Sequence, residues 1–221
     1  LFPYTTLFRS ALVDTYKAAS NWSAYLIYPI DAYPVTDYST ISDSWDEIFA
    51  AETNGTYATK YKVGDTKKID VNNTQVYMQI AAIDGDALAD GSGNAKISWV
   101  CKSILNTHNM NSSNVTTDGW AATAMRTYLR DTLLPTLPDN VKAAIKEVNK
   151  TYYDYGTSST LTIADTIWIP SYREVGFGTN KEDSGVIYSG LFDSATARIK
   201  YNASGSAAHW WLRSAANGTN F

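Results

Sequence analysis

Two regions of the sequence alternate between apolar and polar residues and predict β-hairpins. They are residues 67–71 and 75–84 around Asn72-Asn73, and residues 151–155 and 161–169 around Gly156-Thr157-Ser158-Ser159. A period of two sends successive side chains to opposite faces of a strand, and short Asn- or Gly-containing segments favour tight turns between antiparallel strands. Residues 96–100 predict a further strand. These segments indicate a small, mostly antiparallel sheet.

A period of 3.6 predicts helices between these strands. Ser44 and Glu47 match a capping box that starts a helix ending at Asn54-Gly55. A second helix is predicted over residues 120–133, opened by Thr117 or Asp118 and closed by Pro135, with one apolar stripe: Trp120, Ala124, Met125, Tyr128, Leu129 and Leu133. A third is predicted over residues 139–148, with Val148 on its inner face, and a short helix over residues 172–175.

The segment 209–214, His-Trp-Trp-Leu-Arg-Ser, predicts a strand because aromatic residues suit a pleated surface. Alternation would send Trp210 and Leu212 to one face and Trp211 and Arg213 to the other. The small and polar residues after it are typical of a loop. The long Gly/Ser-rich stretch before it, from Gly176 to Ala208, predicts an ordered excursion of the kind that often carries function.

The predicted organisation has three parts. Residues 1–10 resemble a translated sequencing adapter, and residues 11–43 lack a sustained period, which is typical of a linker or the remnant of an upstream module. The main domain is predicted over residues 44–221. We expect the natural protein to be longer in both directions, and the domain to be α+β, with two helices packed on its sheet and long ordered loops on one side.

Composition excludes several classes of function. The net charge is −4, and no cluster of Lys and Arg could neutralise a run of phosphates, so nucleic acid is not an expected partner. No apolar run is long enough to span a bilayer. The single cysteine, Cys101, excludes a disulfide framework within this chain and is expected to be a buried small hydrophobe.

Two groups of residues resemble metal ligands, but the sequence favours a metal site at neither. Asp84, Asp86 and Asp90 resemble a calcium loop, but Leu88 stands where an EF-hand needs a ligand, which favours a plain turn. His108 and His209 could hold a metal only with carboxylates from distant loops. We therefore expect no metal and no cofactor.

Acid–base chemistry has one candidate pair. Glu174 and Asp183 could act as paired carboxylates of a glycan- or cell-wall-directed hydrolase. The alternative is structural: Glu174, beside Arg173, would form a partly buried ion pair with Arg198 or Arg213, and Asp183 would cap a loop turn. The structural alternative is favoured, because a loop turn is the simpler explanation of Asp183. Nucleophilic catalysis is not expected either, because neither His108 nor His209 sits in a recognisable nucleophile motif.

The tryptophans divide into two groups. Trp99, Trp120 and Trp168 lie in apolar-patterned elements and are expected to pack in the core. Trp211 is the best candidate for an exposed ring that stacks on a sugar or another ligand.

Several ordered motifs resemble a bacterial family, the domain of unknown function 6273. They are Tyr61-Lys62-Val63-Gly64-Asp65-Thr66, Met110-Asn111-Ser112, Met125-Arg126-Thr127-Tyr128-Leu129, residues 150–155, Trp168-Ile169-Pro170-Ser171 with Arg173-Glu174, Glu182-Asp183-Ser184-Gly185, and residues 210–214. The resemblance implies a C-type-lectin-like fold and occurrence in surface proteins of bacteria or in phage. It also implies that a variable loop and a closing strand follow the double tryptophan.

A broader similarity links the Pro170-Ser171 turn to the formylglycine-generating branch of lectin-like folds. That enzyme needs a pair of cysteines for copper, which Cys101 alone cannot supply. The expected function is therefore non-catalytic binding of a glycan or protein ligand, at an extracellular, cell-surface or virion location. The expected contacts are Trp211, Asn217, Thr219, Asn220 and His209, and the alternatives are the hydrolase above or a structural spacer.

Overall fold

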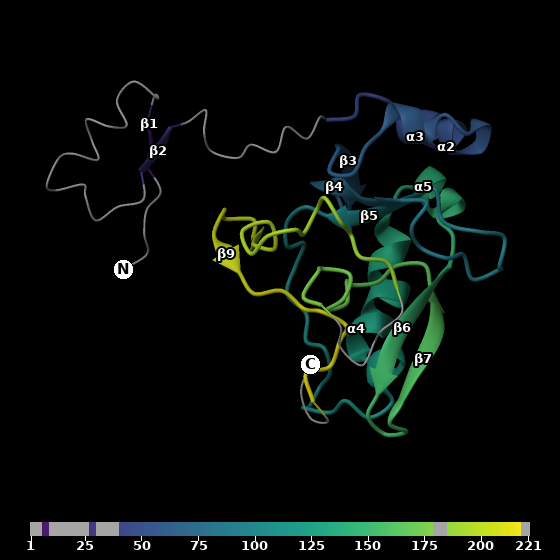
Figure 1. The fold of residues 1–221 in the computed structure, drawn as a ribbon, viewed down its shortest axis with the longest axis vertical. Coiled ribbons are helices and arrows are strands. Elements are labelled where there is room, and N and C mark those ends of the chain that lie inside the picture. Colours follow the sequence, from purple (N-terminus) through teal and green to yellow (C-terminus); the bar gives the residue numbers. More distant parts are fainter. Residues whose placement is uncertain (1–5, 9–26, 30–39, 179–184, 218–221) are drawn as a thin grey trace, which may run out of the picture. The chain divides into compact units, whose positions relative to one another are not determined.

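The computed structural model describes residues 6–8, 27–29, 40–178 and 185–217 (Figure 1). The chain divides into two compact units, Leu1–Tyr38 and Ser39–Phe221. In the first unit, β1 (Thr6–Phe8) pairs in parallel with β2 (Ile27–Pro29), so the residues resembling an adapter include one described strand. All other features below belong to the second unit.

The second unit begins with two helices, α2 (Trp45–Asn54) and α3 (Tyr57–Lys60). The predicted capping box is confirmed: the Ser44 hydroxyl accepts from the Glu47 N–H, and the Glu47 carboxylate accepts from the Ser44 N–H at 2.7 Å. Gly55 ends α2 with a φ of 81°, a conformation that costs a residue without a Cβ very little. Both ends of α2 are therefore set by local sequence.

A three-stranded antiparallel sheet follows, in the order β3 (Thr66–Val71), β4 (Thr74–Ile83) and β5 (Ile97–Cys101). The first predicted hairpin is confirmed, since Val71 pairs with Thr74 across Asn72 and Asn73, whose φ values are both positive as a type I′ turn requires. The second hairpin is confirmed as well, and consists of β6 (Val148–Asp154) and β7 (Ser159–Asp165). Its strands begin earlier than predicted, and the second ends at Asp165 and not at residue 169. A last pair of short strands is formed by β8 (Lys200–Tyr201) and β9 (Ala207–Ala208).

The predicted helix over residues 120–133 is broken at its start. A short 3-10 helix, η1 (Gly119–Ala122), precedes α4 (Ala124–Tyr128), and the chain continues as the π-helix η2 (Leu129–Leu133) and the 3-10 turn η3 (Leu134–Thr136). The side chain of Thr123, and not that of Thr117 or Asp118, caps α4 by accepting from the Arg126 N–H. The predicted apolar stripe is confirmed in part: Trp120, Met125, Leu129 and Leu133 are buried. Tyr128 is half-buried, and Ala124, in the first turn of α4, is exposed.

The predicted helix over residues 139–148 is too long. Helix α5 (Asp139–Ala144) ends earlier, and Val148 starts β6. Tertiary pairing explains the difference: Leu88 bridges to Val148, and the Asn149 N–H donates to the Ala87 carbonyl at 2.8 Å. The segment 172–175 forms turns and not the predicted helix.

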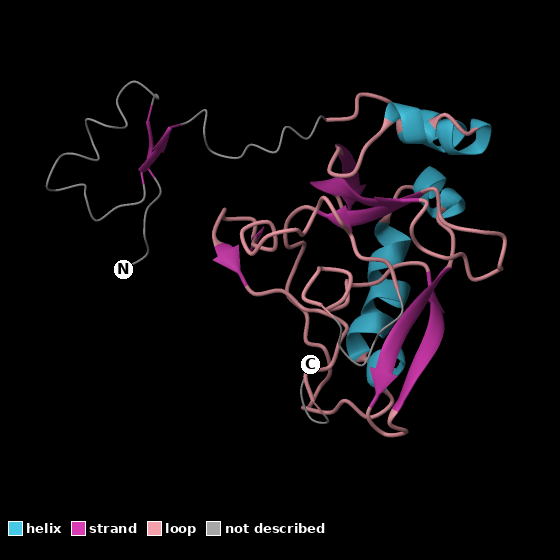
Figure 2. Ribbon diagram, in the orientation of Figure 1, coloured by secondary structure: helices cyan, strands magenta, loops and turns pink. Residues whose placement is uncertain are grey.

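Three buried apolar clusters form the core. One joins helix α4 to the hairpin β6–β7 and includes residues of β3 and α5 and the fully buried Trp120. Figure 2 shows α4 and this hairpin running alongside each other. A second joins α2 and α3 to the three-stranded sheet. The third collects Val175, Tyr188, Leu191 and Phe192 under the irregular later part of the chain. Helix and antiparallel sheet thus share the unit, as expected for an α+β fold.

The double-tryptophan segment is not a strand, contrary to the prediction. Residues 209–214 are irregular, and the Arg213 N–H donates to the Pro170 carbonyl at 3.0 Å. Trp210 and Leu212 pack together on the third cluster as expected, but Trp211 is exposed and Arg213 is buried. The alternation fails because these side chains enter separate environments: the third cluster, the surface at His108 and an internal ion pair.

Candidate functional site

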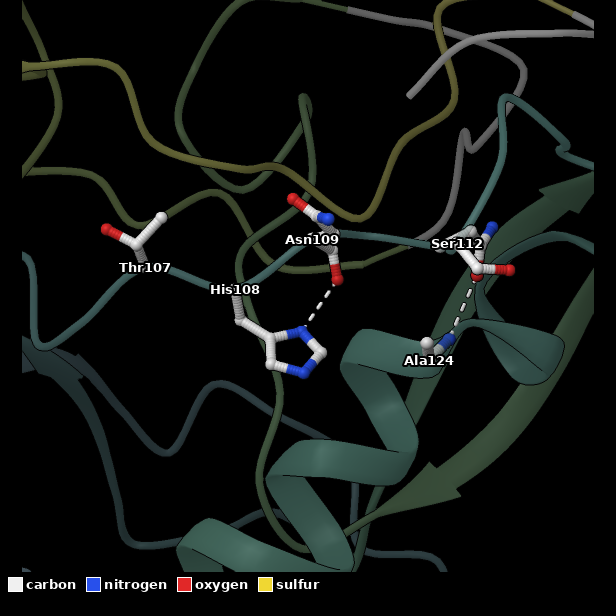
Figure 3. A pocket seen from close by; sticks show the side chains of 6 residues that line it. Thr107, His108, Asn109, Ser112 and Ala124 are labelled. Atoms are coloured by element: carbon white, nitrogen blue, oxygen red, sulfur yellow. Dashed lines mark hydrogen bonds between the residues drawn. The ribbon is translucent and has the colours of Figure 1, made fainter.

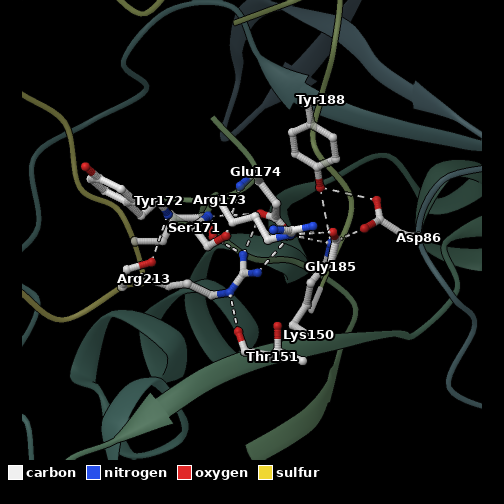
Figure 4. Close-up of polar contacts among 12 residues, drawn as sticks. Asp86, Lys150, Thr151, Ser171, Tyr172, Arg173, Glu174, Gly185, Tyr188 and Arg213 are labelled. Atoms are coloured by element: carbon white, nitrogen blue, oxygen red, sulfur yellow. Dashed lines mark hydrogen bonds and ion pairs between the residues drawn. The ribbon is translucent and has the colours of Figure 1, made fainter. Parts of the chain in front are cut away.

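A buried ion pair holds the Pro170-Ser171 turn against the segment 210–214. Arg213 donates from Nη1 to Oε2 of Glu174 at 2.7 Å and from Nη2 to Oε1 at 2.8 Å. Glu174 also closes a capping box within its own turn, since its carboxylate accepts from the Ser171 N–H and the Ser171 hydroxyl accepts from the Glu174 N–H. Figure 4 shows these groups facing one another.

Lys150 extends this pair into a larger cluster. Its Nζ lies 3.0 Å from Oε1 of Glu174 and 2.5 Å from Oδ1 of Asp86, which lies in the loop after β4. The hydroxyl of Tyr188 lies 3.1 Å from the same Nζ and donates to Oδ2 of Asp86 at 3.2 Å. The Ser98 hydroxyl donates to that Oδ2 at 2.5 Å. Four separate segments of the chain therefore meet at Lys150.

The cluster is charge-balanced and excluded from solvent. It holds two cations and two carboxylates, and Lys150, Glu174 and Arg213 are each 1% exposed. The ring of Trp168 lies 4.0 Å from Nζ of Lys150 and shields it further. Such a cluster is costly to desolvate and becomes stabilising only when every charge keeps its partner.

Burial and neighbouring groups have opposite effects on the pKa of Glu174. Desolvation alone would raise the pKa, but the charges of Arg213 and Lys150 and the hydrogen bonds from Arg213 and Ser171 outweigh it and lower the pKa to about 2. Burial, together with the nearby carboxylates of Glu174 and Asp86, raises the pKa of Tyr188. At neutral pH the cluster therefore holds an ionised Glu174 and a neutral Tyr188.

The other two arginines of the predicted ion pair lie elsewhere. Arg173 donates from Nε to the Gly185 carbonyl at 3.0 Å. Arg198 donates to the carbonyls of Val175 and Gly176, and its guanidinium lies 4.6 Å from the Phe177 ring centroid. Arg213, and not Arg198, is thus the residue placed against Glu174.

The three aspartates that resembled a calcium loop are separated. Asp84 accepts from the Tyr57 hydroxyl at 2.7 Å, Asp86 belongs to the buried cluster, and Asp90 caps its own turn through Ser92. In the described part of the chain, no three His, Cys, Asp or Glu side chains gather as a metal site would require.

Trp211 lies on the surface. Its side chain is 43% exposed, and its indole Nε1 donates to the His108 carbonyl at 2.9 Å, which fixes the orientation of the ring. The His108 imidazole stacks on Tyr128 with centroids 4.2 Å apart, and its Nδ1 hydrogen-bonds to the Asn109 carbonyl. Residues 103 positions apart in the sequence are thus brought together at one surface.

An open hollow of about 410 Å³ lies beside this imidazole (Figure 3). The residues that line it are neutral or weakly basic: Thr107, His108, Asn109, Asn111, Ser112 and Ala124. Asn111 is committed to structure, since it accepts from the Ala124 N–H and donates to the Val115 carbonyl. Thr107, Asn109 and Ser112 keep their side-chain polar groups unbonded within the described part of the chain.

Of the remaining predicted contact residues, the structure describes His209 and Asn217. His209 and Asn217 are exposed, and the Asn217 carbonyl accepts from the Thr116 hydroxyl at 3.1 Å. Thr219, Asn220 and the candidate acid Asp183 lie outside the described residues.

The buried partners Lys150 and Tyr188 were missed by sequence reasoning. The available signal was the register of β6, where Lys150 shares the inward face with Val148 and Tyr152. A lysine on the inward face of a strand predicts a buried carboxylate, because lysine is almost never fully buried unpaired. Predicting residues up to 148 as a helix hid that register.

The family model described as a domain of unknown function (DUF6273) matches residues 94–221, more than half of the chain. The chain belongs to the DUF6273 family. Lys150, Glu174, Tyr188 and Arg213 lie within the DUF6273 match, whereas Asp86, α2 and the hairpin β3–β4 precede it. No curated protein and no solved structure matches the sequence. None of the described helices combines the length and the apolar character that crossing a membrane demands.

Proposed function

We propose that this DUF6273 chain is a non-catalytic binding module, and that its contact surface includes Trp211 and the hollow beside His108. The exposed indole of Trp211 carries the proposal. A large aromatic ring that is fixed by a hydrogen bond and left open to solvent loses little entropy when a ligand packs on it.

The adjoining hollow supports a ligand that is polar. The unbonded amide of Asn109 and the hydroxyls of Thr107 and Ser112 can donate and accept hydrogen bonds, and none of the six lining residues is a carboxylate, lysine or arginine. A glycan or a polar protein loop fits such a surface, whereas a strongly charged ligand would find no counter-ion there.

The buried cluster does not support the hydrolase alternative. A catalytic acid must reach the substrate, but Glu174 is 1% exposed and both its oxygens are held by Arg213, Lys150 and Ser171. Its low pKa also favours the ionised form, which cannot protonate a leaving group.

The finer parts of the proposal rest on resemblance. A lectin-like architecture and a place on a bacterial or phage surface come from the family motifs around the Pro170-Ser171 turn and the double tryptophan. A structural spacer remains the competing non-enzymatic function, and it makes the opposite prediction about ligands.

The test is a screen of the purified chain against glycan and bacterial surface-protein arrays, followed by titration of each ligand found. We expect Trp211→Ala to weaken binding at least about tenfold, as for a central aromatic contact. Tyr77→Ala, which removes a similarly exposed ring from β4, is the matched control and should leave the affinity unchanged. Equal effects of the two variants would place the site elsewhere, and no binding on any array would favour the spacer.

The hydrolase alternative is tested separately with Glu174→Gln. Turnover of a polysaccharide by the wild type, lost in this variant while glycan binding persists, would show that the module is an enzyme.

A further inference from the structure

Lys150 and Asp86 are placed as the two halves of an amide. The amine nitrogen of Lys150 lies 2.5 Å from one oxygen of the Asp86 carboxylate, and both side chains are buried, at 1% and 4% exposed. They are 64 residues apart in the sequence, so the fold alone creates this encounter. Two reacting groups held in contact and out of water gain a very large effective concentration.

We propose that Lys150 and Asp86 condense within the folded chain to form an isopeptide bond, with Glu174 as the catalytic proton carrier. The bond would join Nζ of Lys150 to Cγ of Asp86 and release one molecule of water. No oxidant, metal or second substrate is needed.

The groups around the pair suit each step. One proton first moves from the Lys150 ammonium to Oδ1 of Asp86, which leaves a neutral amine and a neutral acid. The Nζ electron pair then attacks Cγ, and the carbonyl electron pair moves onto Oδ2. The hydroxyls of Ser98 and Tyr188 both donate to Oδ2, at 2.5 and 3.2 Å, and stabilise the negative charge that forms there.

Glu174 completes the reaction. Its Oε1 lies 3.0 Å from Nζ, within reach to accept a second proton from the nitrogen and return it to Oδ1. The bond from Cγ to Oδ1 breaks, water leaves, the carbonyl re-forms at Oδ2, and Glu174 is again a carboxylate. The amide nitrogen keeps one hydrogen, so atoms and charges balance.

The burial of the Lys150–Asp86 ion pair favours the amide over the two separate charged groups. Condensation removes one cation and one anion together and leaves Glu174 paired with Arg213 through two hydrogen bonds. The product thus exchanges a buried ion pair, which is costly to desolvate, for a neutral amide. Without Arg213, the same reaction would leave Glu174 as an unpaired buried charge.

The decisive measurement is the intact mass of the purified wild-type chain. We expect it to be about 18 Da below the mass of its sequence, the loss of one water. Tryptic digestion should leave the chain uncleaved at Lys150 and yield a branched peptide that contains both Lys150 and Asp86. A mass equal to that of the sequence, or cleavage at Lys150 in all molecules, would overturn the proposal.

A cyclic imide at one of the three Asp-Gly sequences would produce the same mass loss and must be distinguished: Asp84-Gly85, Asp90-Gly91 or Asp118-Gly119. An imide opens in mild alkali and leaves Lys150 cleavable by trypsin, whereas the proposed amide survives alkali. A loss that maps to any of these three aspartates contradicts the proposal.

Variants assign the roles. Lys150→Met and Asp86→Ala should each have the mass of their own sequence, because one reacting group is missing. Lys142→Met is the control: it removes a lysine that pairs with Asp139 near the surface, and it should still lose about 18 Da. Asp86→Asn should lose about 17 Da, because ammonia replaces water as the leaving group. Glu174→Gln should leave most of the chain unreacted, and full reaction in this variant would overturn the role of Glu174. The wild-type mass decides the proposal even where a variant does not fold.

Discussion

The Arg213 guanidinium donates two parallel hydrogen bonds to the Glu174 carboxylate, and each residue is 1% exposed. This contact ties the segment 210–214 to the Pro170-Ser171 turn, and Lys150 ties both to the hairpin β6–β7. The segment 210–214 is irregular and, among the residues that the structure describes, has no strand partners. The ion pair between Arg213 and Glu174 therefore helps to fix its position.

Removing Arg213 should destabilise the fold strongly. In Arg213→Ala the buried Glu174 carboxylate loses both hydrogen bonds from the guanidinium, and the expected loss is about 3–5 kcal/mol in the free energy of unfolding. Arg130→Ala is the matched control, because Arg130 pairs with Asp131 at the surface, and its loss of stability should be much smaller. Urea unfolding at pH 7 measures both, and similar losses would show that the buried pair is not special.

Acid should weaken the protein through Glu174. Its pKa is about 2 in the folded state and near 4.5 in the unfolded chain, so the unfolded state binds the proton first as the pH falls. The stabilisation is complete above about pH 4.5 and disappears as the pH falls to about 2, a change on the order of 3 kcal/mol. Unfolding measured between pH 6 and pH 2 should be flatter for Glu174→Gln, and parallel curves would contradict the assignment.

The features that were predicted correctly depend on neighbouring residues. The capping box of Ser44 and the Asn72-Asn73 turn need only local hydrogen bonds and backbone angles, so a few residues specify them. The buried apolar stripe of Trp120 and Leu129 likewise follows from periodicity.

The features that were missed depend on partners distant in the sequence. Trp211 and Arg213 were expected on one face of a strand, but the His108 carbonyl and the Glu174 carboxylate draw them to separate environments. Alternation predicts which face a side chain occupies only where a neighbouring strand pairs with the segment. In the described part of the chain, residues 209–214 pair with no strand. The sequence predicts Arg198 or Arg213 as the partner of Glu174, because both are positively charged. Only the three-dimensional structure shows that the partner is Arg213.

Gly119 should tolerate no side chain. A Cβ there would lie 2.6 Å from Cδ2 of Tyr152 and 2.7 Å from the Tyr153 carbonyl oxygen, and its φ is 56°. Gly119→Ala should cost about 3–5 kcal/mol, because backbone strain and a clash with the core add together. Gly91→Ala separates the two effects, since its φ is 74° with nothing within 4 Å of the added Cβ, and it should cost about 1 kcal/mol. Equal losses in thermal unfolding would mean that Tyr152 moves aside freely.

Glu52 should make the protein less stable at alkaline pH. Burial raises the pKa of Glu52 to about 7, even though the charge of Lys96 opposes the shift. The folded state then holds the proton up to about pH 7, whereas the unfolded chain releases it near pH 4.5, so the penalty grows between these values and is complete above pH 7. Glu52→Gln should therefore stabilise the fold by about 1–2 kcal/mol at pH 8 and by almost nothing at pH 4. The exposed residue Glu147 provides the control, Glu147→Gln, and a gain for Glu52→Gln that is the same at both pH values would show that ionisation is not its cause.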